Sequence, residues 1–244
     1  MQTTAKKPLD PVSPPRHIGI LMGNRRDNGS AGASRYRGSL AAARRLIEAA
    51  AKFSVSSLSL YCSATEETEL EGAFPAAHLA HHIADELHFL QAHNLRVVLS
   101  GNLSSLPANL YSKLEQLRLA SAGNDGMIVN LCLSGGGRSE LVRAANRIIE
   151  QRRKHTPGTG TNAAAEPLLT EQQLADSLDL PELPEPDLII RTGGDCRLTG
   201  FPVWQSTYSE FLFSEKEWQD WTAEDLSDSI VEFQHRSRRF GGAQ

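Results

Sequence analysis

The feature that most constrains the fold is a series of short apolar runs that alternate with longer segments of helical periodicity. The run His17–Met22 precedes a helical pattern at Leu40–Lys52, and Ser57–Tyr61 precedes one near Ala76–His93. Runs this short are typical of interior strands, and strands separated by helices form parallel sheets with helices on both faces. The pattern therefore predicts an α/β fold with a central, mostly parallel sheet flanked by helices.

The same alternation continues toward the C-terminus. Further strands are expected at Arg96–Leu99, Met127–Leu133, Asp187–Arg191 and Phe211–Phe213, and further helices at Leu106–Ala122, Glu140–Arg153 and Glu224–Arg238. The polar, glycine-rich stretch Asn24–Ser34 is expected to be a loop, and Thr170 with Gln173 has the spacing of a capping box that opens a short helix. Ligands of such folds bind beyond the carboxyl ends of the strands, so a site is expected there.

Composition and charge exclude several classes of protein. No run approaches the roughly 18 to 20 apolar residues of a membrane span, so no integral membrane segment is expected. The 25 Lys and Arg against 29 Asp and Glu argue against a nucleic-acid partner held by bulk charge. Three cysteines, far apart and odd in number, form neither a disulfide framework nor a zinc cluster. We expect a cytoplasmic protein with a flexible, proline-rich tail at residues 1–15 and a single domain at residues 16–244.

Glycine and arginine residues suited to a polyanion follow three of the predicted strands. They lie at Gly23–Arg26, at residues 134–138 and at Arg191–Thr199. Glycine lets the backbone approach phosphate oxygens, a helix N-terminus offers N–H groups, and arginine supplies a planar fork of donors. One such turn is usually structural, but three at one sheet edge favour a phosphate or diphosphate site. The absence of Walker and G-x-G-x-x-G spacing disfavours a nucleotide.

The segment Asp187–Phe213 (DLIIRTGGDCRLTGFPVWQSTYSEFLF) resembles the arginine-rich signature of the cis-prenyltransferases, the family of undecaprenyl diphosphate synthase. The likeness extends to GNDGMIVNLCLSGGGRSELV at Gly123–Val142, to HIGILM, to LSLYCSATEE and to the closing RRFGG. The resemblance implies a six-stranded, mostly parallel sheet, a hydrophobic cleft and a homodimer. It also implies prenyl diphosphate substrates, with an allylic diphosphate condensing with isopentenyl diphosphate in the presence of Mg²⁺.

The resemblance further implies roles for individual residues. Arg191, Arg197 and Thr199 match residues that hold isopentenyl diphosphate, and Glu210 matches the acidic residue that helps to bind Mg²⁺. The loop that cradles the allylic diphosphate corresponds to Gly23, Asn24, Arg25 and Arg26, with Arg35 as a second arginine of that site. Arg239 and Gly241 match the C-terminal R-x-G motif, which reaches the active site of the partner subunit. Asn24, Arg26 and Glu210 are the expected catalytic residues.

The sequence departs from the family in the allylic half of the site. The family's first strand ends M-D-G-N-G-R-W, and its Asp is the principal metal-linked catalytic residue. Here Met22 is followed directly by Gly23, so that Asp is missing. Ser39 stands where the family has a histidine, and Glu67-Thr68 where it has Asn-Trp. Asp27 and Glu67 are the two carboxylates that could replace the missing one.

The part of the site that would bind the allylic diphosphate departs from the family pattern, while the part that would bind isopentenyl diphosphate keeps it. This contrast predicts a divergent enzyme. Such an enzyme would make a short product, couple prenyl units in a specialised way, or ionise a prenyl diphosphate. One alternative is a noncatalytic partner subunit, because relatives of that kind lose the catalytic Asp and keep R-x-G. Ordinary polyprenyl diphosphate elongation is the other. Retention of Arg191, Arg197, Thr199 and Glu210 favours an enzyme, because a purely structural subunit would not need them.

Overall fold

A computed structural model describes residues 13–22, 32–62, 87–133, 136–155, 168–198 and 200–236, leaving aside the side chains of residues 32–40, 62, 87 and 155. The strands are β1 (His17–Leu21), β2 (Ser57–Cys62), β3 (Arg96–Gly101), β4 (Ile128–Leu133), β5 (Leu188–Arg191) and β6 (Glu210–Phe213). The α-helices are α1 (Gly32–Lys52), α3 (Leu87–Ala92), α4 (Ala108–Ala120), α5 (Arg138–His155), α6 (Glu171–Ala175) and α7 (Ala223–His235). Short 3₁₀ helices lie at Leu103–Ser105 and Trp218–Asp220.

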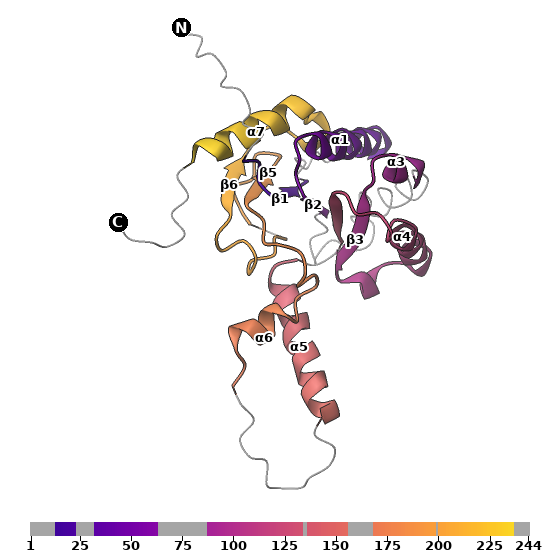
Figure 1. Ribbon diagram of the computed structural model, residues 1–244, viewed down its shortest axis with the longest axis vertical. Helices are drawn as coiled ribbons and strands as arrows, with labels where there is room; N and C mark the ends of the chain where they lie inside the picture. Colours follow the sequence, from indigo (N-terminus) through magenta and orange to yellow (C-terminus); the bar gives the residue numbers. More distant parts are fainter. Residues whose placement is uncertain are drawn as a thin grey trace, which may run out of the picture.

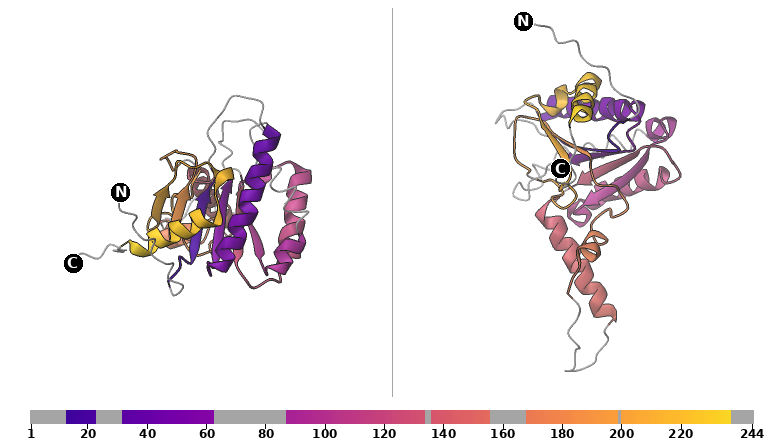
Figure 2. Two further views of the ribbon diagram at one scale, coloured as in Figure 1. Left: turned by 90° about the horizontal axis from the view of Figure 1, so that it is seen from above. Right: turned by 60° about the vertical axis from the view of Figure 1, so that its left-hand side comes forward.

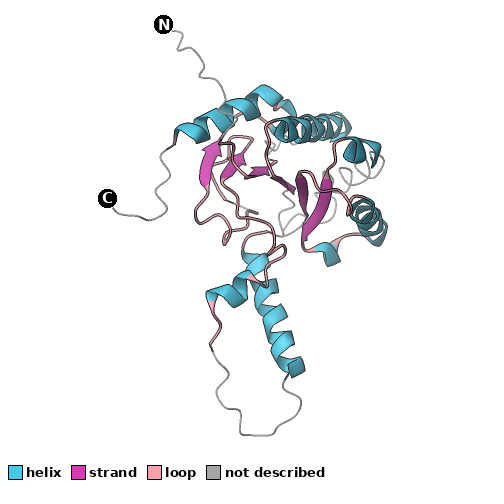
Figure 3. Ribbon diagram, in the orientation of Figure 1, coloured by secondary structure: helices cyan, strands magenta, loops and turns pink. Residues whose placement is uncertain are grey.

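The strands form one six-stranded sheet in the order β3-β4-β2-β1-β5-β6. Every pairing between these strands is parallel, so their carboxyl ends meet at one edge. Helices lie on both sides of the sheet, with α1 and α7 on one side and α5 and α6 on the other (Figures 1 and 3). The predicted α/β fold with a parallel sheet is confirmed.

The two faces of the sheet differ in chemistry because side chains alternate along each strand. One face presents residues such as Ile18, Ile20, Leu58 and Leu60 to a large apolar core. Helices α1, α3, α4 and α7 contribute to that core, and Figure 2 shows α1, α4 and α7 side by side across the sheet. Residues that alternate with this apolar set belong to the opposite face, which we call the polar face because it carries His17, Ser59 and Asn130. A second, smaller apolar cluster also lies on this side of the sheet, formed by Leu21, Tyr61, Cys132, Ile189 and Phe201.

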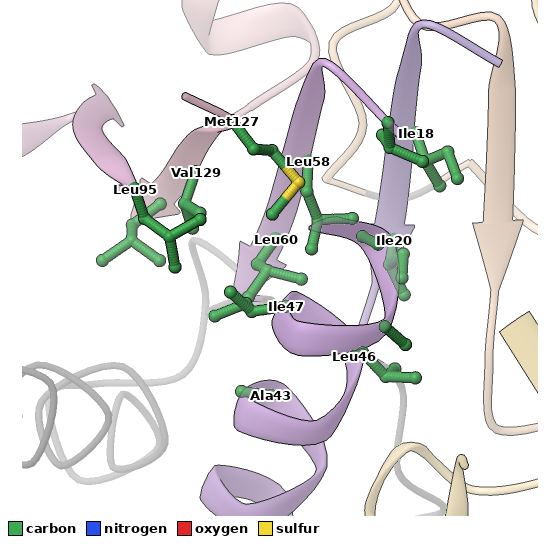
Figure 4. Packing of buried hydrophobic residues seen from close by; sticks show 14 of the residues in the cluster. Ile18, Ile20, Ala43, Leu46, Ile47, Leu58, Leu60, Leu95, Met127 and Val129 are labelled. Atoms are coloured by element: carbon green, nitrogen blue, oxygen red, sulfur yellow. The ribbon is translucent and has the colours of Figure 1, made fainter. Parts of the chain in front are cut away.

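Helix α1 shows how the apolar core is built. Leu46 and Ile47 are at most 4% exposed, and Figure 4 shows Ile47 beside Leu60 of β2. Burying a side chain of this size stabilises the fold by about 1.5 to 3 kcal/mol. The helix begins at Gly32. The first three residues of the helix, 32–34, belong to the stretch that was predicted to be a loop. The boundary was missed because sequence patterns indicate the ends of helices only weakly.

The segment that precedes β1 contacts helix α7. Pro15 is buried, and the Ser13 carbonyl accepts a hydrogen bond of 2.9 Å from Gln234 Nε2 in α7. Ordered contacts therefore begin before residue 16, where the flexible tail was predicted to end, while residues 1–12 lie outside the described residues. Helix α7 ends at His235, three residues before the predicted boundary, and Arg236 is extended.

Two other expectations concern the helices. The capping box predicted at Thr170 and Gln173 is present in both directions, which confirms the start of α6. None of the helices that the structure describes is long and apolar enough to cross a membrane.

The hydrophobic cleft stays a prediction, because residues 63–86 and 23–31 lie outside the described ranges.

Candidate diphosphate-binding site

Strand β5 places Arg191 at the carboxyl edge of the sheet. The strand lies between β1 and β6, and the carbonyl of Leu21 in β1 accepts hydrogen bonds from the backbone N–H and the hydroxyl of Thr192. The Arg191 side chain is only 7% exposed. A guanidinium held this deep needs an anionic partner, because an unpaired buried charge is costly.

The glycines that follow Arg191 have a structural role. Gly193 and Gly194 have positive φ angles of 86° and 79°, a conformation that favours glycine. Their N–H groups donate to the carbonyls of Lys216 and Ser214, both at 2.9 Å. These two amides are therefore already paired within the chain, and the expected contact between this loop and phosphate oxygens stays a prediction for its other groups. The loop is instead tied to the segment that follows β6.

Asp195 joins the two arginines of this loop. Its Oδ2 lies 2.7 Å from Arg191 Nη2, and its Oδ1 lies 3.0 Å from Arg197 Nη2. The hydrogen bonds from Arg191 and Arg197 lower the pKa of the Asp195 carboxyl, so this group is ionised at neutral pH. The structure thus brings two predicted anion-binding arginines together around one carboxylate, which was absent from the predicted site.

The predicted glycine-rich loop after β4 packs against Gly200 and Phe201, which follow the arginine loop after β5. A Cβ at Gly136 would lie 2.4 Å from the carbonyl oxygen of Gly200, and one at Gly137 would lie 2.9 Å from that of Phe201. Close approach of two backbones therefore requires glycine here. The expectation that this loop approaches a phosphate stays a prediction. The convergence of the two loops at the carboxyl side of the sheet is observed.

Glu210 lies away from these arginines. It is the first residue of β6 and pairs with Leu188, whereas Arg191 is the last residue of β5 and pairs with Phe213. Three residues of strand separate the two positions, or about 10 Å. Glu210 also shares the face of the core residue Leu188, whereas Arg191 alternates with it. Within one chain, Glu210 and Arg191 therefore do not face one ligand.

The Glu210 carboxylate is bound by Arg236, which follows α7. Arg236 Nη1 lies 3.2 Å from Glu210 Oε2 and 2.7 Å from the carbonyl oxygen of Phe211. Its Nη2 lies 2.5 Å from Oε1 of Glu232. Burial disfavours the charged form of Arg236, but the hydrogen bonds that Arg236 donates to Glu232 and Glu210 raise its pKa overall. This arginine ties the start of the C-terminal segment to β6, a role that its place in QHRSRR does not reveal.

Most other predicted site residues lie outside the described ranges. They are Gly23, Asn24, Arg25, Arg26, Thr199, Arg239 and Gly241, together with the two possible replacement carboxylates Asp27 and Glu67. Arg35 lies in α1, but its side chain is outside the description. Their assigned roles stay predictions.

The polar face of the sheet carries a chain of hydrogen bonds beside a pocket of about 40 Å³. His17 Nδ1 lies 2.5 Å from the carbonyl oxygen of Pro184, which can only accept, so His17 Nε2 accepts from the Ser59 hydroxyl at 2.8 Å. Ser59 in turn accepts from Asn130, and Asn130 accepts from Ser100. Burial lowers the pKa of His17 to about 4, so its imidazole is neutral. His17 is therefore a buried residue that links β1 to β2 and to the segment before β5 by hydrogen bonds.

Sequence comparison gives a consistent family assignment. Residues 20–241 match the family model described as "Putative undecaprenyl diphosphate synthase". The chain is 31% identical over 235 residues to an isoprenyl transferase of Treponema denticola, covering 93% of this chain and 98% of that protein. It is 32% identical to a ditrans,polycis-undecaprenyl-diphosphate synthase ((2E,6E)-farnesyl-diphosphate specific) of Vibrio vulnificus, covering 93% of this chain and 90% of that protein.

Solved structures agree. A "probable undecaprenyl diphosphate synthase" from Campylobacter jejuni is 28% identical, with a TM-score of 0.75 over 94% of this chain and all of that one. Lavandulyl diphosphate synthase from Lavandula x intermedia is 23% identical, with a TM-score of 0.78 over 93% of this chain and 98% of that one, and shares the fold. Both sequence and architecture therefore place this chain in the undecaprenyl diphosphate synthase family, the cis-prenyltransferases.

Proposed function

We propose that this protein binds prenyl diphosphates and transfers a prenyl group, with Arg191 and Arg197 holding a substrate diphosphate. The observation that carries the proposal is the pair of guanidinium groups gathered by Asp195 at the carboxyl edge of the sheet. Ligands of open parallel sheets bind beyond this edge, and planar arginine forks suit phosphate oxygens. The similarity to the Vibrio vulnificus synthase supports a prenyl diphosphate as the source of that group.

The chemistry asks the protein to stabilise charge and to exclude water. An allylic diphosphate leaves as pyrophosphate, and preorganised cationic donors stabilise the negative charge that grows on the leaving group. Arg191 supplies one such donor from a buried position, while Arg197 is 77% exposed and can follow the ligand. We assign Asn24, Arg25, Arg26 and Arg35 to the leaving diphosphate, and Thr199 to the diphosphate that Arg191 and Arg197 hold.

Mg²⁺ is the metal that we propose, with Glu210 as a protein ligand. A Mg²⁺ ion bound to a diphosphate usually takes only one or two carboxylates from protein. Glu210 is partly exposed and its Oε2 is held by Arg236, so it offers one carboxylate. Within the described residues no three His, Cys, Asp or Glu side chains gather as a metal site. The donor set therefore fits an ion held mainly by the substrate.

The separation of Glu210 from Arg191 supports an active site shared between two copies of the chain. We propose a cytoplasmic homodimer in which residues 16–244 act as one domain. Glu210, Arg239 and Gly241 of one copy would serve the site of the other. Arg236 supports this proposal because it links Glu210 directly to the segment that leads into Arg239.

A specialised reaction is the second candidate, and the missing aspartate favours it. Met22 is followed by Gly23, where the family pattern has Asp before Gly. Loss of that carboxylate weakens the metal-dependent half of ordinary chain elongation. We propose a short-product coupling or a diphosphate ionisation in place of long-chain synthesis. Pyrophosphate release from dimethylallyl, geranyl and farnesyl diphosphates, with and without isopentenyl diphosphate, distinguishes the reactions. No release from any combination would indicate a noncatalytic partner subunit.

Replacement of the two arginines tests the diphosphate site. Arg191→Ala and Arg197→Ala should each weaken pyrophosphate binding by about 1.5 to 3 kcal/mol, because a hydrogen bond to a charged group is lost. Lysine at either position should restore part of the affinity, because lysine lacks the planar fork. Arg118→Ala is a matched control, since Arg118 lies on α4 and pairs with Glu115. Unchanged calorimetric affinity in both site variants would refute the assignment.

A further inference from the structure

We propose that Asp195 is a built-in anion that occupies the two arginines until a diphosphate displaces it. This inference rests on the proposed diphosphate site and concerns a residue to which that site assigns no role. Asp195 touches both candidate arginines, with one carboxylate oxygen on each. The carboxylate therefore stands in the free protein where a phosphate oxygen would stand in the complex.

The burial of the three side chains supports displacement. Arg191 is 7% exposed, whereas Asp195 is 45% and Arg197 is 77% exposed. The buried guanidinium stays in place, and the two partners at the surface can move. Because Asp195 is ionised, it repels an incoming diphosphate at short range. A diphosphate carries more charge than one carboxylate, so it wins the competition for the arginine donors.

The backbone around Asp195 permits this exchange. The preceding glycines are held by the carbonyls of Lys216 and Ser214, which fixes the loop up to residue 194. From Asp195 to Leu198 no regular helix or strand constrains the chain. Movement of the Asp195 side chain therefore leaves Arg191 and its strand unchanged. The consequence is a site that binds diphosphate more weakly and releases it faster than two arginines alone would.

Asp195→Asn tests the proposal because asparagine keeps the shape and one acceptor and removes the charge. Pyrophosphate affinity, measured by calorimetry, should increase about three- to fivefold, the upper part of the range expected for partly exposed ion pairs. Dissociation of pyrophosphate should slow by a similar factor, since affinity changes act mainly through the off-rate. Asp195→Glu keeps the charge and should stay within about threefold of the parent protein.

Glu115→Gln is the matched control, because it removes a carboxylate from an arginine pair on α4. It should leave pyrophosphate affinity unchanged. Equal or weaker pyrophosphate binding by Asp195→Asn would overturn the proposal and would make Asp195 a positioning residue for the arginines. If Asp195→Asn fails to fold, Asp195→Ser takes its place with the same expected gain. If Arg191→Ala and Arg197→Ala bind pyrophosphate like the parent, the proposed function itself fails and Asp195 has no anion to compete with.

Discussion

Arg191 ends β5 and Glu210 begins the neighbouring strand β6, three residues apart along the sheet and on opposite faces. Parallel pairing makes this separation unavoidable, because the end of one strand lies beside the end of the next. The resemblance to the family implies that both residues act on one substrate. Their separation is the reason for our proposal that the site draws on a second chain.

Glu210→Gln should reduce the Mg²⁺ response of turnover. Because Glu210 is proposed to act through Mg²⁺, pyrophosphate affinity measured without Mg²⁺ should stay within about twofold of the parent. Glu232→Gln is the control, since Glu232 also binds Arg236 but lies on α7. The measurement is turnover across a Mg²⁺ titration. An identical response in the Glu210 and Glu232 variants would exclude Glu210 as a metal ligand.

Deleting residues 238–244 should abolish turnover and leave the fold intact. Arg236 remains in the truncated chain, so the contact between α7 and the carbonyl of Phe211 is kept. The free energy of unfolding should change by less than about 0.5 kcal/mol, the range for sites away from packed contacts. Prenyl transfer and urea unfolding measure the two effects. Normal turnover by the truncated protein would show that Arg239 and Gly241 are not part of the site.

Inserting Asp between Met22 and Gly23 should lower the Mg²⁺ concentration needed for half-maximal turnover. The pairing of Leu21 with Arg191 brings the end of β1 beside the end of β5, so we expect a carboxylate inserted directly after Met22 to reach the proposed site. Inserting Asn at the same point controls for the added length. A Mg²⁺ titration of both variants gives the answer. The prediction fails if the two insertions respond alike, or if the unmodified protein already makes a long polyprenyl diphosphate with strong Mg²⁺ dependence.

The neutral, buried His17 predicts that stability falls with acidification. Its pKa is about 4 in the folded protein against an ordinary 6.5, so the unfolded chain binds the extra proton first. Stability from this group is complete above pH 6.5 and is lost between pH 6.5 and 4 as pH falls. Between pH 7.5 and 5 the loss is about 2 kcal/mol. Urea unfolding of His17→Gln should lack this part of the pH dependence, whereas the exposed His93→Gln should keep it. Parallel pH profiles for all three proteins would contradict the prediction.

The fold was largely predictable because its signals are local. Alternation in Ser57–Tyr61 and the apolar run at His17–Met22 each identify a strand without reference to the rest of the chain. The start of α1 was placed too late, at Leu40 in place of Gly32, because the residues between them give little apolar periodicity. Boundaries depend on end effects that a pattern does not contain.

The site was less predictable because its details depend on distant contacts. The pairing of the Gly193 and Gly194 amides with Lys216 and Ser214 follows from how the segment after β6 returns, which no motif encodes. The position of Glu210 at the start of β6 could have been predicted from the sequence. It directly precedes the predicted strand Phe211–Phe213, so it had to lie at the amino end of that strand. The signature motif is continuous in the sequence but spans β5 and β6, so its two ends lie apart in the structure.

The contrast between the two faces of the sheet has a consequence for folding fidelity. Ile18 and Leu58 lie on the apolar face, while His17 and Ser59 alternate with them on the polar face. A slip of one residue in the pairing of β1 with β2 would move histidine and serine side chains into the apolar core, where they would lose their hydrogen-bond partners. Misaligned sheets are thus penalised on both sides at once. A variant that makes Ser59 apolar would remove that safeguard and would also leave the buried Asn130 amide without its partner.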